Sequence, residues 1–213
     1  MLSMAAHGDG AGRVALALGV AAALLVTTSV AVAQERGAAA RFAATFELGL
    51  GTVGTASDGR GRGQMATVWG MDLRYHAPTG PGVVGRVRMI DGVTDSPDVG
   101  VVLLELGYAH RLVLWEGGTA HSLDASLALA GGSVTYGQSG DGRCLSPCAP
   151  PPDLWAFGIG ATVAYSFRIG SAAAAIGPWG HVLPLTTDGS DKLHFGAGLA
   201  VRLGFDAALG GER

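Results

Sequence analysis

Residues 41–54 read RFAATFELGLGTVG and place bulky apolar side chains on alternate positions. Successive side chains of a β-strand point to opposite faces, so Phe46 and Leu48 share one face while Glu47 and Gly49 share the other. A soluble sheet normally carries larger polar side chains on its solvent face, yet here that face is nearly bare. The bare face needs a physical explanation, and the same pattern recurs along most of the chain.

Period-2 alternation divides residues 42–205 into eight segments of about 10 to 14 residues, separated by clusters of Gly, Asp, Ser and Pro. The segment 65–77 alternates most regularly. In 172–183 a run of alanines gives no phase and Pro178 removes a ladder donor, so a strand with a bulge is expected there. The predicted strands are 42–53, 65–77, 83–91, 100–114, 121–134, 154–167, 172–183 and 193–205.

The connections between these segments alternate in length. Those after the first, third, fifth and seventh strands are mostly long, and the others are short. Long and short loops therefore fall at opposite ends of an up-and-down meander, as in a membrane barrel with short periplasmic turns and longer external loops. The long connections are GTASDGRGRGQ, TDSPDVG, residues 135–153 and PLTTDGSDK, and the short ones are PTGPG, EGGTA and RIGS.

The composition of the polar face separates a membrane barrel from a soluble, lipocalin-like barrel, because both alternate apolar and polar positions. In a soluble barrel the polar face is the outside and would be rich in lysine. Here it is mostly Gly, Ala, Ser and Thr, and Lys192 is the only lysine among 14 basic residues. We therefore expect an all-β, eight-stranded antiparallel barrel that spans a membrane, with small residues lining the narrow lumen.

Charged residues at the lumen-facing positions occur in both signs. Charges that are removed from water are stable only when they are paired and hydrogen-bonded. The sequence therefore predicts a salt-bridged, largely plugged lumen, and a path for ions or small solutes is the alternative. The expected lumen charge cluster comprises Glu47, Asp72, Arg74, Arg86, Arg88, Glu105, Arg111, Asp124 and Arg202.

Aromatic residues gather near the predicted strand ends in two groups. Two belts of this kind mark the membrane interfaces of transmembrane barrels. Core packing of a soluble barrel is the alternative interpretation. The expected interface aromatics are Phe42, Trp69, Tyr75, Tyr108, Trp115, Trp155, Tyr165, Phe167 and Phe205.

The N-terminal residues have the form of a secretory signal peptide. Arg13 precedes the apolar run 14–33, which ends in a small-residue AVA cleavage site. The same run is long enough to span a membrane as an uncleaved anchor, which is the alternative. Cleavage would divide the chain into a signal peptide (1–33), a periplasmic N-terminal segment (34–41), the barrel (42–205) and a C-terminal tail (206–213).

The sequence also speaks against two other classes of protein. No apolar run of about 18 residues recurs after residue 33, which excludes a helical multi-span membrane protein. The formal net charge of -3 argues against a nucleic-acid binder.

The pattern resembles the small eight-stranded outer-membrane barrels of the OmpA/OmpX type. The resemblance rests on AVAQ after the apolar run, on eight amphipathic strands, and on HFGAGLAVRLGF at 194–205, which resembles the family's assembly signal. That signal normally ends the chain on its aromatic residue, whereas DAALGGER follows Phe205 here. The resemblance implies a location in the outer membrane of a Gram-negative-type envelope, contact with its lipids and a porin-like barrel.

Cys144 and Cys148 lie in the longest predicted loop, in GRCLSPCAPPP. A zinc site would need further ligands nearby, and the sequence offers none. We expect a local disulfide, which agrees with an exported protein. Asp91, Asp95 and Asp98 do not have the spacing of an EF-hand loop, so a solvated acidic turn is preferred to a calcium site.

No arrangement of residues requires an enzyme or a cofactor. His121 alternates with Ser122 and Asp124 on one strand, so the three cannot form a triad on one face. A rim pair such as Ser133 or Ser190 with His181 or His194 would suit a lipid-modifying barrel enzyme, without support from spacing. We expect a monomer with a structural or surface-interaction role, whose partners bind loops 54–64 and 135–153. A narrow pore, a lipid-modifying enzyme and a soluble lipocalin-like binder are the alternatives.

Overall fold

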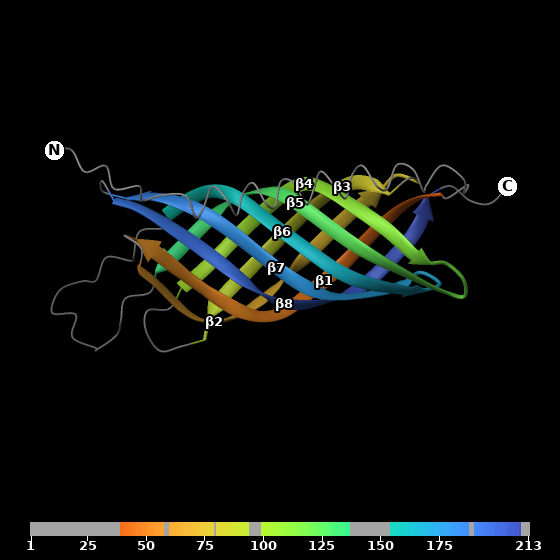
Figure 1. Ribbon diagram of the computed structural model, residues 1–213, viewed down its shortest axis with the longest axis horizontal. Coiled ribbons are helices and arrows are strands. Elements are labelled where there is room, and N and C mark those ends of the chain that lie inside the picture. The colour runs from red at the N-terminus through yellow and green to blue at the C-terminus, as the bar shows by residue number, and fades with distance from the viewer. Residues whose placement is uncertain are drawn as a thin grey trace, which may run out of the picture.

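The computed structural model describes residues 39–57, 60–78, 80–93, 99–136, 154–187 and 190–209. These residues form one closed antiparallel barrel in which each strand pairs with its neighbours in the sequence and β8 closes onto β1 (Figure 1). The predicted fold is confirmed. The eight strands are β1 (Ala40–Ser57), β2 (Arg60–His76), β3 (Pro81–Gly92), β4 (Val99–Trp115), β5 (Thr119–Tyr136), β6 (Leu154–Ile169), β7 (Ala172–Thr187) and β8 (Ser190–Leu209).

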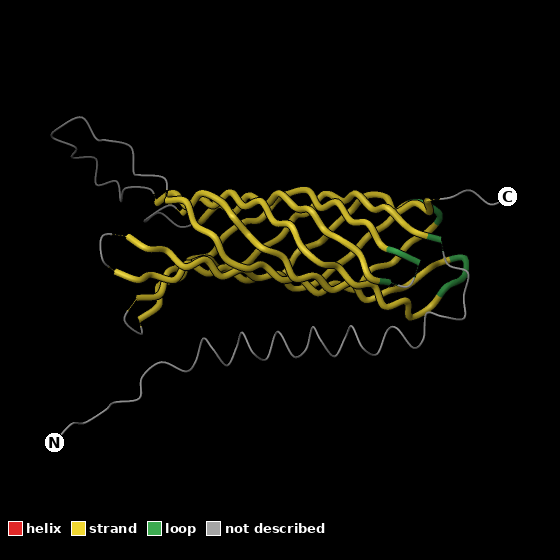
Figure 2. The backbone as a smooth tube through the Cα atoms, turned by 90° about the horizontal axis from the view of Figure 1, so that it is seen from above, coloured by secondary structure: helices red, strands yellow, loops and turns green. Residues whose placement is uncertain are grey.

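The two ends of the barrel differ. At one end, called here the short-turn end, β2–β3, β4–β5 and β6–β7 are joined by tight turns, and these are the turns drawn in green in Figure 2. The other end, called the loop end, carries the connections 93–98 and 137–153. Strands of 16 to 20 residues make up most of the barrel. About 9 to 11 residues suffice to cross a bilayer, so the strands are longer than a membrane requires.

Two of the predicted long loops are wrong. β1 pairs with β2 as far as Ser57 with Arg60, so most of the predicted loop 54–64 is strand. β7 pairs with β8 as far as Thr187 with Ser190, which converts most of PLTTDGSDK into strand. Glycine and polar residues predict loops here, but the two strands of each hairpin continue to pair with each other beyond the barrel wall, and this pairing outweighs the weak strand propensity of these residues.

The predicted bulge in β7 is also wrong. Thr162 pairs with Trp179 and, three positions along, Tyr165 pairs with Ile176, so the register is the same on both sides of Pro178. The barrel accommodates the missing ladder donor without an inserted residue. The register shift lies instead between β4 and β5, at Val113 and Trp115.

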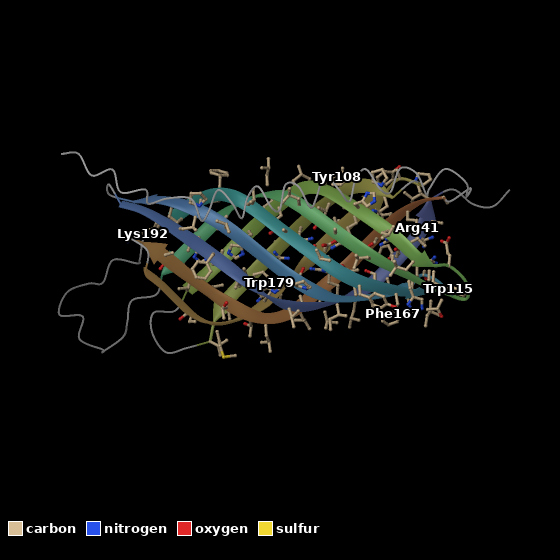
Figure 3. The ribbon with its side chains drawn as sticks, in the orientation of Figure 1. Arg41, Tyr108, Trp115, Phe167, Trp179 and Lys192 are labelled. Carbon is tan, nitrogen blue, oxygen red and sulfur yellow. The ribbon has the colours of Figure 1, made fainter. Side chains whose placement is uncertain are left out.

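The outer face of the barrel is apolar. Leu104 and Leu106 are 64% and 67% exposed, while Glu105 between them is buried. The same alternation extends around the barrel, and the apolar side chains project outward in Figure 3. None of the described residues forms a helix long and apolar enough to cross a membrane. An exposed apolar surface of this extent would be unstable in water, so the strands face lipid.

The interior is less uniform than the sequence predicted. Toward the loop end it is filled by a hydrophobic cluster that includes Val53, Leu103, Val134, Trp179 and Leu183, all at most 3% exposed. Small residues and charges fill the remainder. The described side chains therefore divide the interior into an apolar half and an ionic half.

Candidate functional site

Glu47 on β1 is the centre of the ionic half. Its carboxylate lies 3.1 Å from Arg88 Nη2 on β3 and accepts a hydrogen bond of 3.1 Å from Arg202 Nε on β8. Arg202 is the direct cross-strand neighbour of Glu47, whereas Arg88 reaches it from two strands away, beyond Gly70. The side chains of Glu47, Arg88 and Arg202 are at most 1% exposed. The ion pairs of Glu47 therefore connect neighbouring strands of the barrel wall and also extend across the interior.

Arg86 on β3 extends this network to β2 and β4. Its Nε donates to Asp72 Oδ2 at 2.8 Å, and its Nη1 donates to Glu105 Oε2 at 2.5 Å. Both partners are its cross-strand neighbours in the register. Arg74 donates to the same Asp72, from Nε to Oδ1 at 2.6 Å. Asp72 is thus shared between two guanidinium groups, and the buried charges of opposite sign compensate one another.

A second group of ion pairs lies at the short-turn end. Arg111 Nε donates to Asp124 Oδ1 at 2.8 Å, and Arg111 also pairs with Asp206. Arg41 Nε donates to Asp206 Oδ1 at 2.6 Å, and Arg41 lies at this end in Figure 3. Thus all nine residues of the expected lumen charge cluster lie in the interior, and eight of them are buried.

The sequence predicts that Arg41 and Asp206 lie outside the barrel, in the segments 34–41 and 206–213. They belong to it because β1 begins at Ala40 and β8 continues to Leu209. The period-2 alternation would have placed both residues in the lumen. Arg41 lies six positions before Glu47, and Asp206 lies four positions after Arg202, so both spacings are even. Both therefore share the lumen-facing phase.

A guanidinium group and three aromatic rings stack on one another from the ionic half into the apolar half. The Arg88 guanidinium lies 5.1 Å from the ring centre of Trp179, which stacks on His181 with ring centroids 5.9 Å apart. His181 stacks on His194 at 5.3 Å. Neither imidazole has a hydrogen-bond partner among the described residues. Sequence reasoning did not assign Trp179 to the interior because the alanine run of β7 gave no phase.

The expected interface aromatics lie on the outer face. Phe42 is partly buried, and the other eight are exposed. Tyr108, Trp115 and Phe167 lie toward the short-turn end in Figure 3. Trp155, the second residue of β6, lies at the loop end, while Trp69 in the middle of β2 donates from Nε1 to Asp91 Oδ2 at 3.3 Å. Aromatic side chains are therefore present near both ends of the apolar surface.

The catalytic combinations that involve His121 or Ser133 are not assembled, and the side chain of Ser190 lies outside the described residues. His121 faces outward and bonds to the Tyr165 hydroxyl at 2.6 Å, away from Ser122 and Asp124. Ser133 is the cross-strand neighbour of two exposed residues, Val102 and Trp155, so it shares the outer face while His181 is buried.

Other sequence predictions fall on residues that are not described. The signal peptide 1–33, the pair Cys144 and Cys148, and most of loop 135–153 lie outside the described residues. So do Asp95 and Asp98. Within the described ranges, no group of three or more His, Cys, Asp or Glu side chains could hold a metal ion.

No protein family model matches the chain, and no curated protein sequence matches it. Solved structures do match. Neisserial surface protein A is 12% identical, with 76% of this chain and 96% of that chain covered and a TM-score of 0.52. The Yersinia pestis attachment invasion locus protein Ail, in complex with the heparin analogue sucrose octasulfate, is 12% identical over 78% and 99%, with a TM-score of 0.48. OprG from Pseudomonas aeruginosa is 13% identical over 81% and 97%, with a TM-score of 0.43.

The match to Neisserial surface protein A establishes a common fold. The chain has the fold of the small eight-stranded outer-membrane barrels, the group that its sequence resembles.

Proposed function

We propose that this protein is a monomeric outer-membrane barrel with a structural or surface-interaction role and a lumen closed to steady solute flow. The observation that carries the proposal is the contrast between the two faces of one strand. On β4, Leu104 and Leu106 are largely exposed, while Glu105 between them is completely buried and ion-paired. This arrangement suits a lipid exterior and a filled interior.

The closed lumen is supported by the burial of its charges. Glu47, Arg86, Arg88, Glu105 and Arg202 come from four strands, and each is at most 1% exposed. A conducting pore needs a water-filled path along which ions keep partial hydration. Charges that pair with one another out of contact with solvent do not provide such a path.

The surface-interaction role is supported by the loop end of the barrel. β2 pairs with β3 only from Ala66 onward, whereas it pairs with β1 back to Arg60. The β1–β2 hairpin therefore rises above β3 and takes the place of the loop 54–64 as a candidate contact surface. The connection 137–153 leaves the barrel at the same end and is the second candidate. If the loop end is the external surface, the short-turn end faces the periplasm, as in other membrane barrels.

Cell fractionation, followed by electrophoresis of unboiled and boiled samples, tests the membrane assignment. We expect the protein in the outer-membrane fraction and a change of mobility on boiling, because a folded barrel resists detergent until heated. Recovery of a folded monomer from the soluble periplasm without detergent would favour the lipocalin-like alternative.

Planar-bilayer recording of the purified protein tests the closed lumen. We expect no steady single-channel conductance above the bare bilayer. Reproducible conductance steps would favour the narrow pore. Lipid turnover that is lost when Ser or His residues are replaced would favour the enzyme.

A further inference from the structure

Two histidines lie side by side in the apolar half of the barrel. His181 on β7 and His194 on β8 are at most 3% exposed, and their rings stack with centroids 5.3 Å apart. They belong to adjoining strands, in which His181 pairs with Gly196 and Leu183 pairs with His194. The His181 ring occupies the space above Gly196, where a Cβ atom would clash with it. The two imidazoles are therefore a closely packed part of the interior.

The polar atoms of both rings are unsatisfied. All four ring nitrogens are buried and have no hydrogen-bond partner among the described residues. Trp179 stacks on His181, and Leu183 is the cross-strand neighbour of His194, and both belong to the hydrophobic cluster of the apolar half. A neutral imidazole loses only its hydrogen bonds in such surroundings, whereas a charged one also loses the hydration of a full charge. The packed pair is therefore stable only while both rings are uncharged.

The charged groups that face this pair on β3 and β8 are positive. Arg88 on β3 lies over the ring of Trp179, on which His181 stacks. Lys192, at the loop end in Figure 3, precedes His194 by two positions on β8 and so shares its face. Either cation would repel a proton added to the neighbouring imidazole.

The nearby carboxylates are already engaged in the ionic half. Glu105 on β4 reaches toward Gly160, the cross-strand neighbour of His181 on β6. It accepts a hydrogen bond of 3.0 Å from Arg88 Nη1, and Glu47 on β1 accepts one from Nε of the same guanidinium. Neither carboxylate bonds to His181. A proton on either histidine ring would therefore introduce a buried charge without an acceptor.

We infer that His181 and His194 form an acid-sensitive switch, which keeps the loop end of the interior closed at neutral pH and opens it in acid. The inference rests on the proposed closed lumen and adds its regulation. His194 is the cross-strand neighbour of Thr55, in the β1–β2 hairpin, so opening would also loosen that proposed contact surface. Carboxylates that are bound to guanidinium groups stay charged at about pH 5, so the ionic half should remain paired.

The direction and size of the response follow from proton binding. The closed form holds both rings uncharged and therefore binds fewer protons than an open form, so acid favours opening. An imidazole in water has a pKa of about 6.5, which is roughly 1.5 pH units above pH 5. Each ring that is protonated only in the open form should therefore favour opening about 30-fold at pH 5 and very little at pH 7.5.

Hydrogen exchange of backbone amides, followed by NMR, tests the switch. The refolded barrel is compared in dodecyl maltoside at pH 7.5 and pH 5, and protection is expressed relative to an unstructured chain at the same pH. We expect the protection of residues 180–185 and 193–196 to fall about 30-fold or more at pH 5. Residues 172–176 and 201–205, at the short-turn end of the same two strands, should keep theirs. An unchanged loop end, or an equal loss at both ends, would overturn the proposal.

A double variant with His181→Phe and His194→Phe keeps two flat rings in the stack and removes their titration. Its loop end should stay protected at both pH values. The matched control is His121→Phe on the outer face, which should lose protection in acid as the unchanged protein does. Acid-dependent loss of protection in a folded double variant would contradict the assignment to this pair.

Two other histidines of the described chain are buried, and the experiment separates their effects. His76 and His110 each have one hydrogen-bond partner, and they lie on β2 and β4, which pair with neither β7 nor β8. Acid effects that arise from them should persist in the double variant.

A direct measurement decides the question if the double variant does not refold. The ring signals of His181 and His194 in the unchanged protein should remain those of uncharged imidazole until the loop-end amides lose protection. Rings that titrate while the amides stay protected would overturn the switch. Bilayer recording at neutral pH tests the closed lumen separately, so the proposed function and the switch can fail independently.

Discussion

Arg86 and Glu105 are cross-strand neighbours on β3 and β4, and Arg86 Nη1 lies 2.5 Å from Glu105 Oε2 with neither side chain in contact with solvent. On the other side, Arg86 Nε donates to Asp72 Oδ2 at 2.8 Å. One arginine thus links three consecutive strands. In a barrel whose outer face touches lipid, this inward network supplies the polar interactions that lipid cannot provide.

Replacing Arg86 with methionine should destabilise the barrel strongly. The Arg86→Met variant leaves Asp72 and Glu105 buried with fewer counter-charges, and breaking a buried ion pair on one side typically costs about 3–5 kcal/mol. Reversible urea unfolding in phospholipid vesicles, followed by tryptophan fluorescence, measures the change in unfolding free energy.

The matched control is Arg168→Met at the short-turn rim. Arg168 is partly exposed and lies 4.0 Å from an exposed Glu116, so its loss should cost at most about 1 kcal/mol. Equal losses in the two variants would contradict a special contribution of the buried network.

The apolar outer face should tolerate charge according to depth. Leu106→Arg places a charge on the middle of β4 and should cost about 2–4 kcal/mol if the lipid contact is as assigned, while Trp115→Arg at the strand end should cost at most about 1 kcal/mol. Both original side chains are more than 60% exposed, so lost packing does not explain a difference. The same vesicle unfolding assay compares them, and a difference of zero would argue against the lipid-facing orientation.

The close packing of Trp179 on β1 predicts an intolerant glycine. A Cβ atom at Gly51 would lie 2.8 Å from Trp179 Cζ2 and would also meet backbone atoms of β8, which cannot move aside easily. Gly51→Ala should therefore destabilise the barrel by about 1–3 kcal/mol. Gly85→Ala is the control, because nothing lies within 4 Å of its added methyl group, and it should be neutral or slightly stabilising. Thermal unfolding in detergent distinguishes the two outcomes.

The alternation of side chains made most of the fold predictable. Bulky residues such as Leu104 and small or charged ones such as Glu105 occupy adjacent positions, and lipid and a narrow lumen impose opposite demands on them. The same phase placed Glu47, Asp72 and Arg202 on the interior. Which arginine meets which carboxylate was not predictable, because the pairings depend on strand register and on side chains that cross the lumen.

Two features of the sequence concealed structure. The alanines before Pro178 carry no difference between faces, so the inward position of Trp179 and His181 required the pairing of β7 with its neighbours. The glycine-rich segment near residue 60 has a loop-like composition, yet its backbone pairs as the end of a hairpin. Composition reports propensity, whereas the ladder of a closed barrel is set by neighbouring strands.

The length of the β1–β2 hairpin predicts that its end is dispensable for the barrel and important for surface contacts. Replacing residues 55–62 with Asn-Gly, a two-residue turn that matches the twist of paired strands, leaves β1 from Ala40 to residue 54 and β2 from residue 63 to His76. Both remaining strands are longer than the roughly 11 residues that a tilted strand needs to cross a bilayer.

The shortened protein should still enter the outer membrane and change mobility on boiling, because its interior ion pairs are unaffected. Binding of the cells to any surface that the unchanged protein recognises should fall, since the β1–β2 hairpin is a proposed contact surface. Loss of the folded, heat-modifiable form would show that the hairpin end is required for the barrel itself, whereas unchanged binding by a folded variant would shift the contact surface to the connection 137–153.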